Sequence, residues 1–152
     1  MSEEEQADIT EARDKFLRQV YDEQTLTFDA ERLANFAIAC GETAPRYTDP
    51  SHADFQAPPT FPTSLQPSRR MPEGYPKFNG LGMDAGKAVA PIAPIRPGVP
   101  ITARAHVEDI YTKTGRSGRM VFTVVRMTLT DPDEHVLATA DTSIVIRERP
   151  QS

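Results

Sequence analysis

The stretch GETAPRYTDP, residues 41–50, decides the fold of this chain. It comes directly after residues 28–40, in which apolar side chains recur at helical spacing. Asp29 is placed to cap the start of that helix, and Gly41 is the kind of residue that ends one. The predicted helix buries one apolar stripe, made by Leu33, Phe36, Ala37 and Cys40.

Length and charge set the class of protein. At 152 residues the chain has the size of one domain. Its formal charge is -5, and the first 25 residues carry eight acids and three bases, which leaves 14 of each in the rest. The body is therefore neutral, without a basic stripe for nucleic acid. No run approaches the roughly 18 apolar residues of a membrane span, and the acidic N-terminus is unlike a signal peptide, so we expect a cytoplasmic protein.

The single cysteine, Cys40, excludes a disulfide within the chain. Because it lies on the predicted apolar stripe and no histidine is near it in sequence, we expect a small core residue rather than a nucleophile.

Residues 2–22 have the spacing of an amphipathic helix. Its apolar stripe consists of Ile9, Ala12, Phe16, Leu17, Val20 and Tyr21. Acids crowd the start and bases follow, which suits the helix dipole. The favoured interpretation is a helix docked on the body, and the alternative is a helix that packs on a partner. We expect a helical extension over residues 1–24 and one domain over residues 25–149.

Residues 56–86 are rich in proline, which rules out a long helix or a central strand across them. The prolines are Pro58, Pro59, Pro62, Pro67, Pro72 and Pro76. We expect an ordered loop that covers a groove, with room for a short helix between Pro62 and Pro72. The glycine-rich residues 80–86 are a poor dinucleotide fingerprint, because no helix context supports one.

The C-terminal third has the alternating pattern of an antiparallel sheet. The expected strands are residues 88–95, 101–111, 121–129 and 136–146, with turns at residues 113–118 and 130–134. Pro91 and Pro94 place the first of these at an edge or a bulge. Apolar residues on both faces of 120–129 predict a central, covered strand. Helices early and a meander late predict an α+β fold.

The opening stretch resembles the hydratase motif of the MaoC-like hotdog family, in which a helix is followed by Gly-Asp-x-Asn-Pro, His and x-Asp-Pro. The frame is kept by Gly41, Pro45, Asp49 and Pro50. Residues 57–62, 94–98 and 109–118 are similar to further segments of that family in the same order. The resemblance covers about residues 25–147. It implies a hotdog fold, an antiparallel sheet wrapped around a helix, which pairs by its sheet edges and forms acyl-thioester sites between two hotdogs.

The chemical positions of the motif differ from the family's pattern. Its catalytic Asp falls on Glu42, its Asn on Ala44 and its catalytic His on Tyr47. In this the chain resembles the degenerate halves called FAS1-like dehydratase or MaoC N-terminal, which help to hold the acyl chain. The proline-rich segment stands where active halves have a long central helix, which implies a wider groove for a bulky acyl group.

The resemblance therefore implies a non-catalytic, acyl-binding subunit of an (R)-specific enoyl-thioester hydratase or 3-hydroxyacyl dehydratase. Its partner would be a catalytic MaoC-like subunit, or itself as a homodimer. The substrate would be an acyl-CoA or acyl-carrier thioester, without a cofactor, nucleic acid or membrane. The expected substrate-binding positions are Glu42, Tyr47, Pro59, Thr60 and Phe61.

Hydration of an enoyl thioester needs a base, an acid and donors for the carbonyl oxygen. Tyr47, with a reference pKa of about 10, is a poor base at neutral pH. The extra methylene of Glu42 moves its carboxylate by roughly 1 Å, an error that can cost about 10²-fold in rate. In the alternative in which these residues have only structural roles, Glu42 is solvated, Tyr47 packs under the loop and Asp49 caps local N–H groups. We therefore expect no catalytic residue in this chain.

Two alternatives stay open. One is a self-sufficient homodimeric hydratase or thioesterase that uses Glu42 with Tyr47 or His52. The other is a non-enzymatic binding or scaffold module.

Other candidates are weaker. His106 is expected to face outward from a strand and His135 to lie beside a turn, and no two histidines have metal-ligand spacing, so no metal is expected. Arg69, Arg70 and the Arg96 turn are candidates for meeting the phosphates of a CoA or carrier arm.

Overall fold

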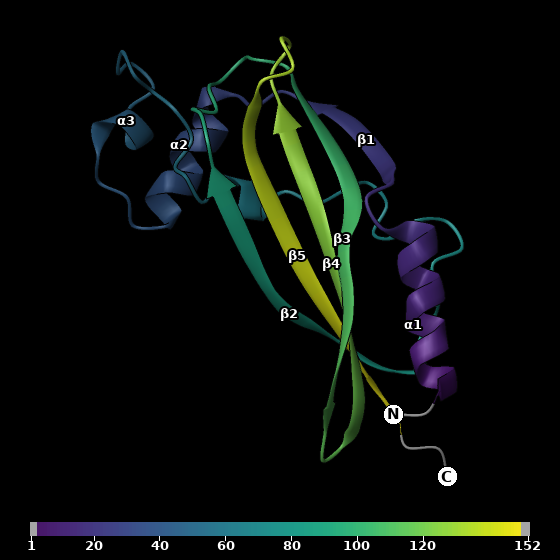
Figure 1. Ribbon diagram of the computed structural model, residues 1–152. Coiled ribbons are helices and arrows are strands. Elements are labelled where there is room, and N and C mark those ends of the chain that lie inside the picture. The colour runs from purple at the N-terminus through teal and green to yellow at the C-terminus, as the bar shows by residue number, and fades with distance from the viewer. Residues whose placement is uncertain (1–2, 150–152) are drawn as a thin grey trace.

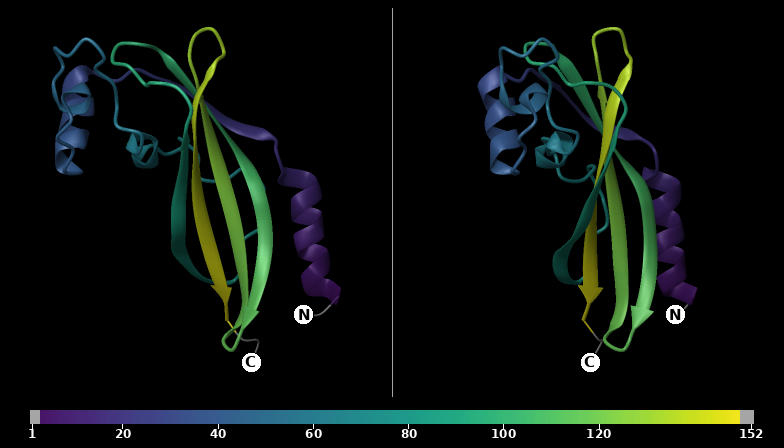
Figure 2. Two further views of the ribbon diagram at one scale, coloured as in Figure 1. Left: turned by 60° about the vertical axis from the view of Figure 1, so that its left-hand side comes forward. Right: turned by 90° about the vertical axis from the view of Figure 1, so that its left-hand side faces the viewer.

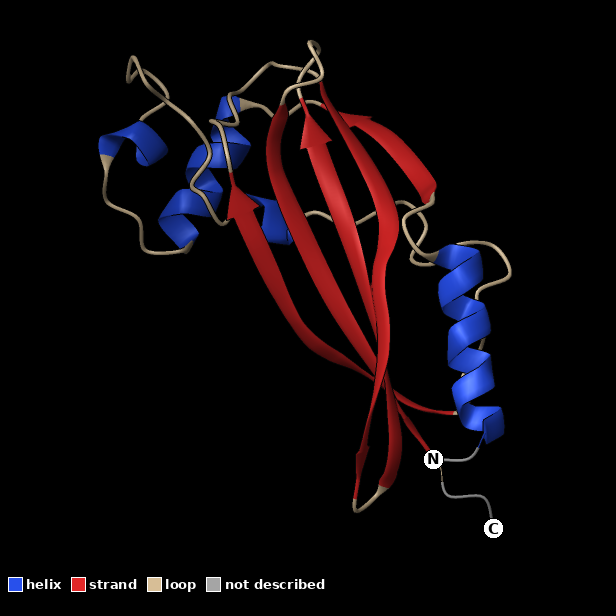
Figure 3. Ribbon diagram, viewed as in Figure 1, coloured by secondary structure: helices blue, strands red, loops and turns tan. Residues whose placement is uncertain are grey.

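The computed structural model describes residues 3–149, which form one five-stranded antiparallel sheet with helices along one face (Figure 1) (Figure 3). The elements are α1 (Glu3–Phe16), β1 (Val20–Leu26), α2 (Ala30–Ala39), α3 (Pro45–Thr48), the 3-10 helix η1 (Phe61–Ser64), β2 (Gly80–Pro91), β3 (Ile101–Gly115), β4 (Gly118–Thr130) and β5 (Val136–Glu148). The strand order is β1-β3-β4-β5-β2. The predicted α+β class and the meander of the C-terminal third are confirmed.

Helix α2 begins and ends where the sequence predicts. The Asp29 side chain accepts a hydrogen bond from the Arg32 amide at 2.7 Å. Gly41 has a φ of +81°, and the Glu42 amide then donates to the Ala37 carbonyl at 3.0 Å. The predicted burial of Cys40 is wrong: its side chain is exposed, because the core ends at Ala37 and the last turn of the helix extends into solvent.

One face of the sheet carries the core. Side chains of β3 and β4 alternate between buried and half-exposed, with Ile101, Val107, Val121 and Leu129 fully buried. β4 lies at the centre of the sheet, as predicted. The expectation that both of its faces are covered is wrong for this chain: Phe122 and its neighbours on the second face stay half-exposed, because the helices pack on the first.

Two clusters divide the buried face. Phe28, Leu33 and Phe61 pack at one end, against inner residues of β3 and β4. Ile9 and Phe16 of α1 pack at the other end, against the β3 and β4 residues Val107, Ile110 and Val121. The favoured interpretation, a helix docked on its own body, is thus confirmed. Both views in Figure 2 place α1 and α2 at separate ends of the sheet.

The predicted helix over residues 2–22 is too long. It ends at Phe16, and Val20 and Tyr21 belong to β1, which pairs with β3. Arg18, with a φ of 59°, turns the chain between the two elements. Ser2, where the predicted helix begins, lies outside the described residues. The proposed boundary between residues 24 and 25 falls within β1.

The predicted edge strand is longer and starts earlier than residues 88–95. It spans Gly80–Pro91, so the proline-rich connection ends at Asn79 and its only regular element is the single turn η1. Glycine is needed at the start of β2, because a Cβ on Gly80 would lie 2.1 Å from the Arg147 carbonyl oxygen. The glycine-rich residues therefore permit close strand pairing, and the absence of a helix after them rules out the dinucleotide fingerprint.

A buried arginine fastens α1 to the sheet. Arg119 of β4 is 7% exposed and donates to Asp8 of α1 at 2.9 and 3.0 Å and to Glu148 of β5 at 2.7 and 2.8 Å. These hydrogen bonds, those to Glu148 first, raise the pKa of the Arg119 guanidinium. The guanidinium thus joins an N-terminal helix to the C-terminal strand.

We predict that Arg119→Met lowers the free energy of unfolding by about 2–3 kcal/mol, since two carboxylates lose their shared cation in a partly buried site. Urea unfolding followed by circular dichroism measures this. Arg116→Met, at the exposed tip of the same hairpin, is the matched control and should stay within about 0.5 kcal/mol of wild type. Equal effects of the two variants would contradict the assigned role of Arg119.

Candidate functional site

The degenerate motif lies on α2, α3 and the turn between them. Glu42 and Tyr47 are both half-exposed. Among the described residues, neither the Glu42 carboxylate nor the Tyr47 hydroxyl has a hydrogen bond or ion pair, and the Tyr47 ring has only the Arg46 guanidinium, 5.9 Å from its centroid. The two positions are therefore not joined as a hydrogen-bonded acid–base pair.

The second half of the motif is held by its own hydrogen bonds. Asp49 accepts from the Ser51 amide at 2.9 Å and from the Ser51 hydroxyl at 2.7 Å, as its predicted capping role requires. These two bonds, the side-chain bond first, lower the pKa of Asp49. His52 is exposed, and its Nδ1 accepts the Asp54 amide at 3.1 Å. One nitrogen of this candidate base is thus already used.

Three of the segments that carry the family resemblance, the motif, residues 57–62 and residues 94–98, meet in space, and the Gln56 amide donates to the Arg46 carbonyl of the motif at 2.9 Å. Arg96 donates to Asp54 Oδ1 at 2.8 Å and to the Phe55 carbonyl at 3.1 Å. The hydrogen bond from Arg96 is the first cause of a lowered pKa at Asp54. The Ala57 amide donates to the Ile95 carbonyl at 2.8 Å. The motif loop, the 57–62 segment and the Arg96 turn therefore form one unit, and Arg96 serves as its tie.

The remaining predicted substrate positions divide between core and surface. Phe61 is 1% exposed and packs edge-on against Phe28 and Phe36, with centroids 4.9 and 5.2 Å apart. It is a core residue in this chain. Pro59 and Thr60 are exposed, and Pro59 lines an apolar cleft of about 200 Å³ between residues 56–62 and 91–95.

A larger cavity, of about 390 Å³, lies between β2, β5 and the connection after η1. Its apolar lining is Pro67, Met83, Val125 and Ile144. Its polar lining is Gln66, Arg70, Asp84, Lys87 and Thr142. Of these only Arg70 was a candidate from the sequence, and its neighbour Arg69 does not line the cavity. The other lining residues could be found only from the pairing of β2 with β5, which brings Lys87 opposite Thr142.

Residues 66–70, which we call the strap, are fastened to β1. Asp22, itself buried, accepts from the Ser68 amide at 2.9 Å and from its hydroxyl at 2.6 Å. Gln24 donates to the Gln66 carbonyl at 2.8 Å, and the Tyr21 hydroxyl donates to the Arg70 carbonyl at 3.0 Å. The connection after η1 thus crosses the sheet from the β2 side to the β1 edge, and Figure 2 shows its teal trace passing toward α1.

His106 and His135 lie where the sequence predicts. His106 is on the opposite face of β3 from the buried Ala105 and Val107, with its Nε2 2.6 Å from Glu108. His135 lies in the turn between β4 and β5.

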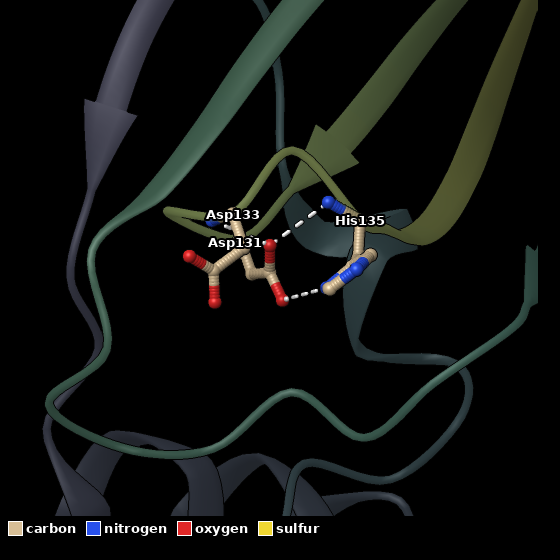
Figure 4. Close-up of side chains that lie close together, drawn as sticks. All are labelled: Asp131, Asp133 and His135. Carbon is tan, nitrogen blue, oxygen red and sulfur yellow. Dashed lines mark hydrogen bonds and ion pairs between the residues drawn. The ribbon is translucent and has the colours of Figure 1, made fainter.

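That turn brings Asp131, Asp133 and His135 together, with possible ligand atoms within 4.8 Å of one another (Figure 4). The Asp131 carboxylate accepts the amides of His135 and Asp133, both at 2.9 Å, and lies 3.2 Å from His135 Nδ1. The backbone bond from His135 is the first cause of a lowered pKa at Asp131. These bonds are those of a tight turn, and they account for the placement of Asp131 and His135.

No helix within residues 3–149 is both long enough and apolar enough to cross a membrane.

A twisted antiparallel sheet in the order β1-β3-β4-β5-β2, with α2 packed on its buried face, defines a domain of the hotdog fold. Residues 16–140 match the model described as FAS1-like, dehydratase domain region. The chain belongs to this family. Comparison with curated proteins found no match.

Solved structures share the fold. A MaoC-like dehydratase from Phytophthora capsici aligns with a TM-score of 0.66 at 20% identity, over 91% of this chain and 50% of that one. The ChsH1-ChsH2 complex from Mycobacterium tuberculosis aligns with 0.61 at 15%, over 97% and 93%. The (R)-hydratase from A. caviae aligns with 0.56 at 16%, over 87% and 97%. The chain thus spans half of the first protein and nearly all of the others, and these likenesses confirm the hotdog fold.

Titration of Tyr21 tests how the strap is held. Burial, with the neighbouring Asp22 charge as a second cause, raises its pKa to about 12 from 10.0. Between pH 10 and 12 the unfolded chain has lost this proton and the folded chain keeps it, so the free energy of unfolding should fall as pH rises.

We predict that Tyr21→Phe makes this fall shallower in urea unfolding between pH 9 and 11. Tyr75, whose pKa burial also raises, titrates in both proteins and cancels in the comparison. Identical pH slopes for wild type and variant would show that Tyr21 is not held protonated by the fold.

Proposed function

We propose that this chain is the non-catalytic, acyl-binding half of a hydratase or dehydratase that acts on (R)-3-hydroxyacyl and 2-enoyl thioesters. Its partner is a MaoC-like hotdog subunit that supplies the catalytic Asp and His. One observation carries the proposal: the motif keeps its frame, while Glu42, Ala44 and Tyr47 occupy its three chemical positions.

The chemistry of hydration supports a partner. A general base must be held within hydrogen-bonding reach of its water, and its own pKa is set by neighbouring groups. Within residues 3–149, Glu42 and Tyr47 have no side-chain hydrogen bond that orients them, and the Ala44 side chain offers no donor for a thioester carbonyl. His52 points one nitrogen at the Asp54 amide. A second subunit is the simplest source of the missing acid and base.

The free edge of β2 is the proposed pairing surface. Among the described strands, β2 pairs only with β5, and almost all of its residues are exposed. Leu81 and Met83 are 54% and 38% exposed on it. An unpaired edge strand is a template for another strand. A partner strand added here would lie beside the cavity under the strap, so the site would be completed between two chains.

The partner at this edge is proposed to be a different hotdog subunit or a second copy of this chain. Two of the solved structures are described as complexes, HadBC and ChsH1-ChsH2. A homodimer through the same edge is the alternative, and acyl-CoA or an acyl carrier is the proposed ligand in both cases. Cytoplasmic localisation, expected from the sequence, stays a prediction.

The test is hydration of crotonyl-CoA and of a long-chain 2-enoyl-CoA by the chain alone and mixed with a MaoC-like subunit encoded beside it. We predict turnover at least about 10²-fold higher in the mixture, the low end of what general acid–base catalysis contributes. Glu42→Gln should change the kcat of the mixture by less than about tenfold, because Glu42 is not the base.

Turnover by the chain alone that Glu42→Gln abolishes would contradict this proposal and support the self-sufficient enzyme. Absence of acyl-CoA binding by both the chain and the mixture would support a scaffold module instead.

A further inference from the structure

The cavity under the strap brings two cations from separate segments to one apolar floor. Arg70 comes from the strap and Lys87 from β2, and Val125 and Ile144 lie beneath them. Its volume of about 390 Å³ falls within the roughly 300–1,000 Å³ of small-molecule sites, which are mostly apolar with a few placed polar groups.

Neither cation forms an ion pair with an acid of the described chain, although the Asp84 carboxylate lines the same cavity. Lys87 Nζ donates to the Thr142 hydroxyl at 3.0 Å, and the Arg70 guanidinium has no hydrogen bond or ion pair there. The third charged group, Asp84, uses one carboxylate oxygen for the Gly86 amide at 2.8 Å. By contrast, five other arginines pair with carboxylates: Arg13, Arg96, Arg104, Arg119 and Arg126.

The position of Arg70 is built into the fold. The Tyr21 hydroxyl holds its carbonyl, and the buried Asp22 holds Ser68 two residues earlier with two hydrogen bonds. Lys87 is fixed in turn by the register of β2 against β5, which sets it opposite Thr142. The backbone at Arg70 and the side chain of Lys87 are therefore held by separate tertiary contacts, and both residues line the same cavity.

We infer that this cavity binds the anionic end of an amphipathic acyl thioester, with Arg70 and Lys87 on the anionic oxygens and Val125 and Ile144 under the apolar segment. The thioester part of this ligand rests on the proposed function. The new element is its anionic group, which Arg70 and Lys87 would bind. Cationic N–H groups bind phosphate and carboxylate oxygens by charge-assisted hydrogen bonds. The anion has two possible sources, a phosphate of the CoA or carrier arm and a carboxylate at the far end of the acyl chain.

The mixed lining of the cavity favours an amphipathic ligand. With a formal charge of -5, the protein as a whole repels anions, so the attraction comes from Arg70 and Lys87 in the lining. A free inorganic anion would leave the apolar floor uncovered. A ligand that joins an apolar chain to one anionic group satisfies both parts of the cavity.

The test is isothermal titration of the chain, and of its mixture with the catalytic subunit, using three ligands. They are dodecanoyl-CoA, dodecanoyl-pantetheine, which lacks the phosphates, and the dodecanoyl-pantetheine analogue with a terminal carboxylate. Arg70→Met and Lys87→Met keep the aliphatic stems and remove the charges. Arg69→Met, outside the cavity lining, is the matched control, and Lys87→Arg is the conservative rescue.

We predict that each cavity variant raises the Kd of an anionic ligand about tenfold, which corresponds to about 1.4 kcal/mol, while the control and the rescue change it less than about threefold. If the cavity variants raise the Kd of dodecanoyl-CoA alone, the anion is a phosphate. If they raise the Kd of the carboxylated pantetheine ester and leave that of dodecanoyl-pantetheine unchanged, the anion is the acyl carboxylate.

If dodecanoyl-CoA binds and the cavity variants behave like Arg69→Met for both anionic ligands, the inference is overturned and the proposed function stands. If no thioester binds the wild-type chain or the mixture, the proposed function fails as well. Folding of each variant is checked by its urea midpoint.

Discussion

Burial of a single face of the sheet is the constraint on which the rest of this structure depends. β3 and β4 place every second side chain on that face, and each fully buried Leu, Ile or Phe there stabilises the fold by roughly 1.5–3 kcal/mol. Helix α2 covers one end and α1 the other. Between them the strap crosses the face, and the cavity lies where neither helix reaches. The edge β2 and the second face stay open.

In the 41–50 motif, the residues that set the backbone geometry differ from the residues at the chemical positions, and this difference explains the candidate site. Glycine and proline at the motif's frame positions set backbone geometry, so they fix the turn whatever the chemical positions hold. Arg96 ties the motif loop to the segment after β2 through Asp54 and Phe55. The backbone of the motif therefore does not depend on the residues at its chemical positions. In the proposed function such a chain contributes a sheet edge, a groove and a few fixed charges.

Much of this could be predicted from the sequence, and the misses have physical causes. The cap at Asp29 and the stop at Gly41 are local effects, so α2 was located closely. Val20 and Tyr21 fit a helical stripe and a strand equally well, and only pairing with β3 decides between them. The early start of β2 was hidden because Gly80 is required by the closeness of the Arg147 carbonyl, a tertiary contact. A groove under the proline-rich loop was expected, but the β2 and β5 residues that line the cavity could not be predicted, since they depend on the pairing of that same strand.

In the proposed function this chain contributes binding and its partner contributes chemistry. The most direct measurement is 2-enoyl-CoA hydration by a fixed amount of the catalytic subunit as this chain is added. We expect turnover to rise to a plateau at one chain per catalytic subunit and to disappear when the partner's catalytic Asp or His is replaced. Turnover that keeps rising in proportion to this chain, and persists without the partner, would contradict it.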